Sequence, residues 1–364
     1  MSDLISKAKS TVLTVKPYVP GKPIDEVKRE LGLQNVIKLA SNENPYPPSP
    51  KVLKALQEAL PSVNRYPNGD CHTLREELSK FLNVKPAQLI FGNGSDELIV
   101  LAVRLFVREG DEVIIAQPSF LVYDIASKIA GADIVSVPLK DFHYDLDAMQ
   151  EAVTPRTRII FLGNPDNPAG TYLTQRAVEE FLAGVPRDVL VFIDEAYFEY
   201  VQAEDYVDSL GLLDRYPNLI VSRTFSKMYG LAGLRVGYAV GGEELCGLFN
   251  RIREPFNVNS MAQAAAVACL QDQAYYRDIA RQVEEQRRYL YIELTRLNLE
   301  YRETYTNFIM VKVSRDAKEM TGHLMRLGVI VRDMSFWGMN NYIRVSIGTA
   351  EENRTFVAAL EKII

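Results

Sequence analysis

The chain has 364 residues, of which 47% are hydrophobic and 24% charged, and its formal net charge is −6. These values are ordinary for a globular protein, and the interspersed, slightly acidic charge argues against a nucleic-acid-binding surface. The length exceeds the usual size of one hydrophobic core, so two domains are expected.

Cysteine and histidine usage predicts neither disulfides nor a metal site. The three cysteines, Cys71, Cys246 and Cys269, are widely spaced and odd in number, as is typical of packing residues in a reducing compartment. The three histidines form no HxxxH or HExxH motif. The N-terminus has early charges and no long apolar run, so we expect a cytoplasmic protein without a membrane segment.

In chain order, the first elements flank a proline-rich loop. Residues 41–50 (SNENPYPPSP) hold four prolines, which disfavour regular structure and indicate a loop or a domain boundary. Apolar residues at helical spacing then predict helices over 51–60 and 73–82.

The middle of the chain alternates between short apolar runs and helical patterns. Helices are predicted over 97–107 and 177–182. The runs read as buried strands at 89–91, 112–116, 133–137, 158–162, 189–193 and 219–221. Such alternation predicts an α/β domain with a parallel sheet covered by helices on both faces.

The C-terminal third has a different pattern. Residues 271–297 predict a long, charged amphipathic helix, and the lack of a linker over 250–271 indicates that a helix joins the two domains. The remainder mixes strands (308–313 and 342–345) with helices (317–327 and 351–362), which predicts a smaller α+β domain.

Four polar motifs follow strands of the predicted parallel sheet. They are GNGSDE (92–97), GNPDNPAG (163–170), DEAY (194–197) and SRTFSK (222–227). Ligands of open α/β sheets bind beyond the carboxyl ends of the strands, so we expect the four motifs to meet at one edge. This coincidence carries more weight than any single motif.

Each motif by itself leaves two readings open. The glycine-rich turn that opens a helix is an anion site, or simple helix capping with Ser95 as the N-cap. Asp194 is a partner for a cation such as a protonated ring nitrogen, or a structural acid held by backbone N–H groups. Asn167 offers an amide to the crevice, or merely stiffens a turn.

The stretch from Ser222 to Gly237 adds an amine and further phosphate ligands. Thr224, Ser226 and Arg235 are of the residue types that bind phosphate, and Lys227 can form a Schiff base with an aldehyde. One ligand needs an anion site, an acid, an amide and a lysine together. That ligand is pyridoxal phosphate, with its phosphate, pyridine nitrogen, phenolic oxygen and aldehyde.

These motifs, together with KPYVPGK (16–22), NRYPNG (64–69) and YIRVSIGT (342–349), occur in the order found in one family. The whole chain resembles the class II, fold-type I pyridoxal-phosphate-dependent aminotransferases. The resemblance implies a large domain over 46–258, with a mainly parallel seven-stranded sheet between helices. A smaller α+β domain would combine 1–45 and 259–364.

The resemblance also implies roles for individual residues. Lys227 would bind the cofactor aldehyde and move the proton, while Asp194 and Tyr197 would complete the catalytic set. The other residues expected to bind the cofactor are Ser95, Asp96, Phe120, Asn167, Thr224, Ser226, Arg235 and Tyr66. Those expected to contact substrate are Tyr18, Asn42, Arg332 and Arg344. Tyr66 resembles a tyrosine that reaches the neighbouring subunit's site, which implies a homodimer with shared sites.

Two departures from the family pattern stand near the expected site. Many relatives have PNNPTG where this chain has PDNPAG, so Asp166 and Ala169 differ while Asn167 is retained. Many also have tyrosine at the stacking position of Phe120, and phenylalanine keeps the stacking but lacks the hydroxyl.

The expected reaction is a ping-pong amino transfer. Glutamate would leave as 2-oxoglutarate, and imidazole-acetol phosphate would become histidinol phosphate, with Arg332 and Arg344 pairing with carboxylate or phosphate. Phe120, Tyr18 and Phe336 would equally suit an aromatic amino-acid transaminase. A phosphothreonine decarboxylase of the same fold is a second alternative. A non-catalytic sensor domain is a third, although this chain has no length for a DNA-binding module.

Overall fold

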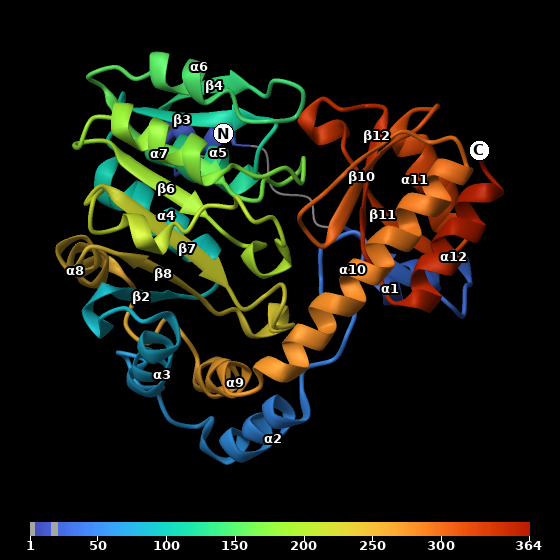
Figure 1. The fold of residues 1–364 in the computed structure, drawn as a ribbon, viewed down its shortest axis with the longest axis horizontal. Helices are drawn as coiled ribbons and strands as arrows, with labels where there is room; N and C mark the ends of the chain where they lie inside the picture. The colour runs from blue at the N-terminus through green and yellow to red at the C-terminus, as the bar shows by residue number, and fades with distance from the viewer. Residues whose placement is uncertain (1–3, 16–20) are drawn as a thin grey trace.

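The structure is a computed structural model that describes residues 4–15 and 21–364 and contains two β-sheets with separate helices (Figure 1). The larger sheet has seven strands in the order β2-β8-β7-β6-β5-β3-β4. Its strands are β2 (Leu89–Gly92), β3 (Glu112–Gln117), β4 (Asp133–Pro138), β5 (Thr157–Gly163), β6 (Leu190–Asp194), β7 (Leu219–Thr224) and β8 (Gly237–Gly241). β8 alone runs opposite to the other six strands, so the predicted α/β class with a mainly parallel sheet is confirmed.

Alternate residues of the large sheet enter two different hydrophobic cores. Val113, Ile159 and Ile220 pack with helices α4 (Ser95–Phe106), α5 (Leu121–Ala130) and α8 (Glu243–Ile252). Ile114, Ile160 and Val221 belong to the other core, to which helices α3 (His72–Leu82), α6 (Leu146–Glu151), α7 (Gln175–Gly184) and α9 (Ser260–Leu270) contribute. Successive side chains of a strand point to opposite faces, so strands that are apolar throughout require helices on both sides.

The smaller sheet joins the two ends of the chain. Its order is β1-β11-β12-β10-β9, formed by β1 (Ile37–Leu39), β9 (Tyr301–Arg302), β10 (Phe308–Lys312), β11 (Val329–Asp333) and β12 (Tyr342–Ser346). β1 pairs in parallel with β11, and the other pairs are antiparallel. The helices of this part are α1 (Ile24–Leu31), α11 (Ala317–Arg326) and α12 (Ala350–Glu361).

One long helix runs between the two sheets. In Figure 1, α10 (Gln273–Arg296) starts beside α9 below the large sheet and ends among the elements of the small sheet. The expected helix between the two parts of the chain is α10, which a short turn separates from α9, ending at Leu270. α9 packs on α2 (Pro50–Ala59) and α3, on the large-sheet side. The division of the chain at residues 45/46 and 258/259 stays a prediction.

The helices carry no sign of a membrane segment. Within residues 4–15 and 21–364, none is both long enough and apolar enough to cross a bilayer.

Candidate active site

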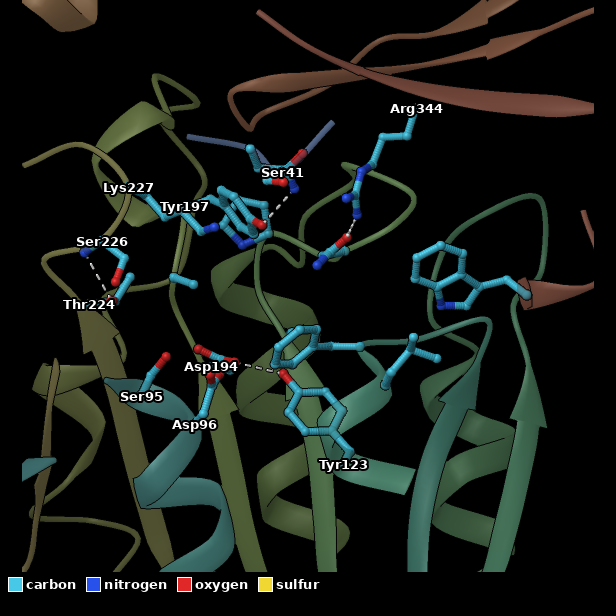
Figure 2. A pocket seen from close by; sticks show the side chains of 18 of the residues that line it. Ser41, Ser95, Asp96, Tyr123, Asp194, Tyr197, Thr224, Ser226, Lys227 and Arg344 are labelled. Atoms are coloured by element: carbon cyan, nitrogen blue, oxygen red, sulfur yellow. Dashed lines mark hydrogen bonds between the residues drawn. The ribbon is translucent and has the colours of Figure 1, made fainter. Parts of the chain in front are cut away.

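A cavity of about 180 Å³ lies beyond the carboxyl ends of β5, β6 and β7, where the motifs were expected to meet (Figure 2). It brings together twelve residues singled out in the sequence, namely Asn42, Ser95, Asp96, Phe120, Asn167, Asp194, Tyr197, Thr224, Ser226, Lys227, Arg235 and Arg344. Figure 2 shows Ser95, Thr224 and Ser226 at one side and Arg344 at the other, with Lys227 and Tyr197 in between.

Two described residues expected in the site, Tyr66 and Arg332, are not among those that line this cavity. Tyr66 is 83% exposed, and its ring stacks on Phe256 with centroids 4.7 Å apart. Arg332 lies on β11 opposite Arg344, and its guanidinium is 5.8 Å from the ring of Trp337. Tyr18 lies outside the described residues.

The glycine-rich turn GNGSDE forms a concave anion site at the start of α4. The N-cap of α4 is Gly94, with φ of 82°, and not Ser95 as expected, because Ser95 is already the first helical residue. A Cβ on Gly94 would lie 2.3 Å from Nη2 of Arg235, and one on Gly237 would lie 2.6 Å from the amide nitrogen of Ser95. Glycine is therefore required for this close approach of a guanidinium to a helix N-terminus.

Hydroxyls and a guanidinium complete the anion site. Arg235 donates to Oδ2 of Asp96 at 3.1 Å and to Oγ of Ser226 at 3.4 Å. The amide of Ser226 donates to Oγ1 of Thr224 at 3.1 Å, so the loop after β7 folds back on itself. The donors come from the ends of α4 and β7 and suit a phosphate group.

The amine of Lys227 is enclosed beside this anion site, 5.7 Å from the ring centroid of Tyr197. Loss of hydration, together with the positive charge of Arg344, lowers the pKa of Lys227 from 10.5 to about 8. A larger share of the amine is therefore neutral, and hence nucleophilic, near neutral pH than in an exposed lysine.

The carboxylate of Asp194 is held by two side-chain hydroxyls at the end of β6. Tyr123 donates to Oδ2 at 2.9 Å, and Ser222 donates to Oδ1 at 3.0 Å (Figure 2). Burial raises the pKa of Asp194 to about 6, although both hydrogen bonds oppose this shift. These partners favour an acid aimed into the cavity over one held by backbone N–H groups, and a positively charged ring nitrogen there would offset the cost of burial.

The opposite side of the cavity is built around Arg344 from β12. This guanidinium donates to Oδ1 of Asn167 at 2.5 Å and to the carbonyl of Ala40 at 3.3 Å. It also lies near two aromatic rings, 5.2 Å from the centroid of Phe308 and 5.7 Å from that of Trp337. The arginine is thereby fixed by both sheets and can pair with an acidic group that enters the cavity.

Tyr197 and Asn42 form a link between the two parts of the chain. Asn42 donates from its side-chain Nδ2 to the hydroxyl of Tyr197 at 2.9 Å, and its backbone amide donates to Oγ of Ser346 at 2.8 Å. Burial raises the pKa of Tyr197 to about 12, so the phenol stays protonated and can donate a hydrogen bond. Phe120 is the N-cap residue of α5, and its ring meets that of Tyr123 edge-on at 5.5 Å.

A buried ion pair lies directly behind the site and was missed in the sequence. Nε of Arg223 donates to Oε2 of Glu195 at 2.8 Å, and the guanidinium lies 3.6 Å from the centroid of Phe198. Both side chains are at most 6% exposed. Glu195 follows Asp194 and Arg223 precedes Thr224, so the pair ties together the strand ends that carry the acid and the lysine loop.

Three further residues of the site are not marked by any motif that pointed to them in the sequence. Tyr123 lies within α5 and Trp337 within the short 3₁₀ helix η8 (Ser335–Trp337), and neither belongs to a motif after a strand. Ser222 stands in the SRTFSK motif, but its alignment with Asp194 follows only from the β6–β7 register. Predicting this contact requires knowing that β6 and β7 are parallel neighbours, since their register then places Ser222 beside Asp194.

The chain matches the family model described as aminotransferase class I and II over residues 34–360. A histidinol-phosphate aminotransferase of Moorella thermoacetica is 47% identical over 361 residues, which covers 99% of this chain and 94% of the relative. One of Methylobacillus flagellatus is 46% identical and covers 100% and 99%.

Solved structures give the same result for the fold. The histidinol-phosphate aminotransferase of Sinorhizobium meliloti in complex with pyridoxal-5'-phosphate superposes with a TM-score of 0.91 at 29% identity, covering 98% of this chain and 97% of the other. The aspartate aminotransferase of Thermus thermophilus with maleate has a TM-score of 0.84 at 20% identity over 98% and 99% of the chains, which shows a shared fold only.

Proposed function

This chain belongs to the class I and II aminotransferase family, and we propose from that premise that it transfers an amino group between histidinol phosphate and 2-oxoglutarate with pyridoxal phosphate as cofactor. The products would be imidazole-acetol phosphate and glutamate, as in histidine biosynthesis. The relatives named above support this choice of substrate. The observation that carries the reaction type is the enclosed Lys227 amine between an anion site and the buried carboxylate of Asp194.

The side chains of the cavity fit pyridoxal phosphate at each of its polar groups. The α4 N-terminus with Ser95, Thr224, Ser226 and Arg235 would hold the phosphate. Asp194 would pair with the ring nitrogen. When bound, the cofactor supplies an aldehyde for the substrate amine and a ring that draws electrons from the reacting carbon.

The residues of this chain would then orient the substrate and move a proton. Nζ of Lys227 would take a proton from the reacting carbon and return it on the other side of the transfer, because it is the enclosed amine beside the anion site. Tyr123 and Ser222 keep the Asp194 carboxylate in place. Tyr197 would donate from its hydroxyl to the phenolic oxygen of the cofactor. Asn167 would donate from Nδ2 to the same oxygen, because its Oδ1 already accepts from Arg344.

Arg344 is the residue proposed to bind the acidic group of each substrate in turn. A guanidinium pairs bidentately with a carboxylate or a phosphate, so one residue serves both glutamate and histidinol phosphate. Arg332, opposite Arg344 on β11, is the second candidate. The contact of Tyr18 with substrate stays a prediction.

A homodimer with shared sites also stays a proposal. The ring of Tyr66 is exposed and stacks on the exposed Phe256, with Leu60 and Val63 also exposed nearby in the sequence. Apolar side chains gathered in this way are typical of a covered surface. A cytoplasmic location is likewise a prediction, supported by three cysteines that are buried thiols.

The cofactor assignment is tested by absorbance and by chemical reduction. The purified protein should absorb visible light, and borohydride should fix the cofactor on the peptide that contains Lys227. Lys227→Ala should lose both properties, whereas Lys51→Ala, on the exposed side of α2, should keep them. A wild-type protein that binds no pyridoxal phosphate would contradict the proposal.

The substrate assignment is tested by comparing amino donors. We expect histidinol phosphate to give a higher kcat/KM than phenylalanine or tyrosine with 2-oxoglutarate as acceptor. A preference for phenylalanine would instead indicate an aromatic amino-acid transaminase. Release of carbon dioxide from threonine phosphate would indicate a decarboxylase.

A further inference from the structure

A second cavity of about 610 Å³ adjoins the candidate active site. Three of the residues that line each cavity are common to both, namely Phe120, Leu121 and Trp337. The second cavity extends along β3 and α5 on one side and along η8 on the other, and it is larger than the cavity that holds Lys227. These three side chains therefore form a wall between the two spaces.

Trp337 is the part of this wall that belongs to the small sheet's side of the molecule. Its Nε1 donates to the carbonyl of Ser119 at 2.8 Å, directly before Phe120. The bond links η8 to the β3–α5 connection, so the indole bridges elements that are 218 residues apart in the chain. Its ring plane is thereby fixed at the boundary of the two cavities.

The same indole contacts both candidate arginines. The guanidinium of Arg344 lies 5.7 Å from its ring centroid, and that of Arg332 lies 5.8 Å away. Both distances fall within the range of cation–π attraction, which strengthens where water is excluded. Trp337 thus helps to fix the arginine that faces the cavity and connects Arg332 to it, although Arg332 does not line that cavity.

We propose that Trp337 is a specificity-determining residue of this site. It closes the wall toward the second cavity, and it holds Arg344 in position for the acidic group of the substrate. Substrates with a compact side chain and a suitably placed anion are accepted, while larger aromatic side chains meet the indole. The predicted preference between amino donors rests on the proposed amino transfer. The predicted effect of Trp337 on anion binding does not depend on that reaction.

Two substitutions separate the two contributions of Trp337. Trp337→Phe keeps a ring in the wall but removes the N–H that donates to Ser119. Trp337→Ala removes the ring and joins the cavities. Phe142→Leu is the matched control, because it removes an arginine–aromatic contact of the same kind, 4.4 Å from Arg302, outside both cavities.

The first measurement is the affinity of the cofactor-loaded protein for inorganic phosphate, by titration calorimetry. We expect Trp337→Ala to bind phosphate about ten-fold more weakly than wild type, Trp337→Phe to lie between them, and Phe142→Leu to be unchanged. Trp337 is the only tryptophan of the chain, so a saturable change in wild-type emission during the titration would report binding beside this indole. Unchanged affinity in Trp337→Ala, or no phosphate binding by wild type, would overturn the proposal.

The second measurement is the ratio of kcat/KM for phenylalanine to that for histidinol phosphate. In Trp337→Ala this ratio should rise about ten-fold or more, mainly through KM, because the joined cavities admit the larger ring. A purely structural role would lower both values together and leave the ratio unchanged, which would also overturn the proposal. If wild type transferred no amino group from any donor, the proposed function would fail, and the calorimetry would still decide the role of Trp337.

Discussion

Lys227 and Asp194 are ionisable groups enclosed by the same cavity, and loss of hydration shifts their pKa values in opposite directions. The pKa of Lys227 falls to about 8 and that of Asp194 rises to about 6. Both shifts disfavour the charged form. In the cofactor-free protein the two groups are therefore closer to neutrality than exposed groups, and a charged ligand between them would change both pKa values.

Cofactor loading should depend on pH through Lys227. Its neutral amine attacks the aldehyde, so the loading rate should rise with pH and level off above about 8. Arg344→Gln removes a positive charge that lowers this pKa, and should move the inflection to higher pH. Stopped-flow absorbance after mixing with pyridoxal phosphate measures the rate. A wild-type rate that rises without inflection beyond pH 9.5 would contradict the assignment.

Asp166 should make the fold less stable as pH rises. Its carboxyl accepts from Tyr144 at 3.0 Å and from the amide of Ala169 at 2.9 Å, but burial raises its pKa from 3.8 to about 7. The folded state binds the proton more tightly than the unfolded state. The contribution of Asp166 is therefore fully favourable below pH 4, and is lost as pH rises through 7, by at most about 4 kcal/mol.

Asp166→Asn tests this contribution. The variant should lose the fall in unfolding free energy between pH 5 and pH 8, measured by urea denaturation at each pH. Asp188→Asn, at an exposed carboxylate, should follow the wild-type profile. Identical profiles for Asp166→Asn and wild type would show that Asp166 does not titrate in this range.

At the scale of elements, the ends of β6 and β7 carry the reacting groups, and the Glu195–Arg223 pair holds these ends together. The amide of Glu195 also donates to the carbonyl of Ser222 at 2.8 Å, continuing the ladder beyond the last strand residue. Neither Glu195 nor Arg223 lines either of the two cavities. It is a positioning pair, and it acts on Asp194 and Lys227 through the backbone.

Breaking this pair should cost more than replacing it. Arg223→Met leaves a buried carboxylate without its cation, which costs about 3–5 kcal/mol of unfolding free energy. The double variant Arg223→Met/Glu195→Met should recover much of this loss, because it buries no unpaired charge. Urea denaturation measures both. The exposed pair of Arg176 and Glu180 is the control, and Arg176→Met should leave stability nearly unchanged. A double variant less stable than Arg223→Met would contradict the account.

The predicted elements agree with the structure where hydrophobic patterns are strong. The six apolar runs became β2 to β7, and all but the edge strand β4 are buried along most of their length. β8, with the sequence GYAVG, was missed because it has only five residues and glycine, which is depleted in strands, stands at both ends. β1 was missed because three residues are too short for any periodicity, and its pairing with β11 is wholly non-local.

The site was predictable where chemistry follows a strand, and not where a distant element completes it. Asp194 ends a strand, and Lys227 and Asn167 lie in loops after strands, so parallel topology alone brings them together. Trp337 enters from η8, and its place beside Arg344 depends on how the small sheet sits against the large one. No local pattern encodes that arrangement.

At the scale of the whole molecule, the proposed dimer predicts that two inactive variants complement each other. If Tyr66 serves the partner's site, a mixed dimer of Lys227→Ala and Tyr66→Phe subunits contains one site with both native residues. Mixing the two after mild denaturation should therefore restore activity that neither variant has alone.

If each subunit used its own Tyr66, mixing would restore no activity, because every site would then contain either Lys227→Ala or Tyr66→Phe. Tyr66→Phe keeps the ring that stacks on Phe256, so loss of activity in it would report the hydroxyl rather than the fold. Sedimentation should first show that each variant is a dimer. A monomeric wild-type protein would contradict both the dimer and the role of Tyr66.

The parallel pairing of β1 with β11 has a consequence for synthesis of the protein. Ile37 aligns with Val329, so β1 must wait for roughly 290 further residues before its partner exists, a contact of very high sequence separation. In the large sheet the longest wait is about half as long, because Leu89 of β2 pairs with Val240 of β8. On the ribosome, a chain released before Val329 would therefore lack Arg344 and leave β1 without a neighbour, exposing a strand edge to other chains.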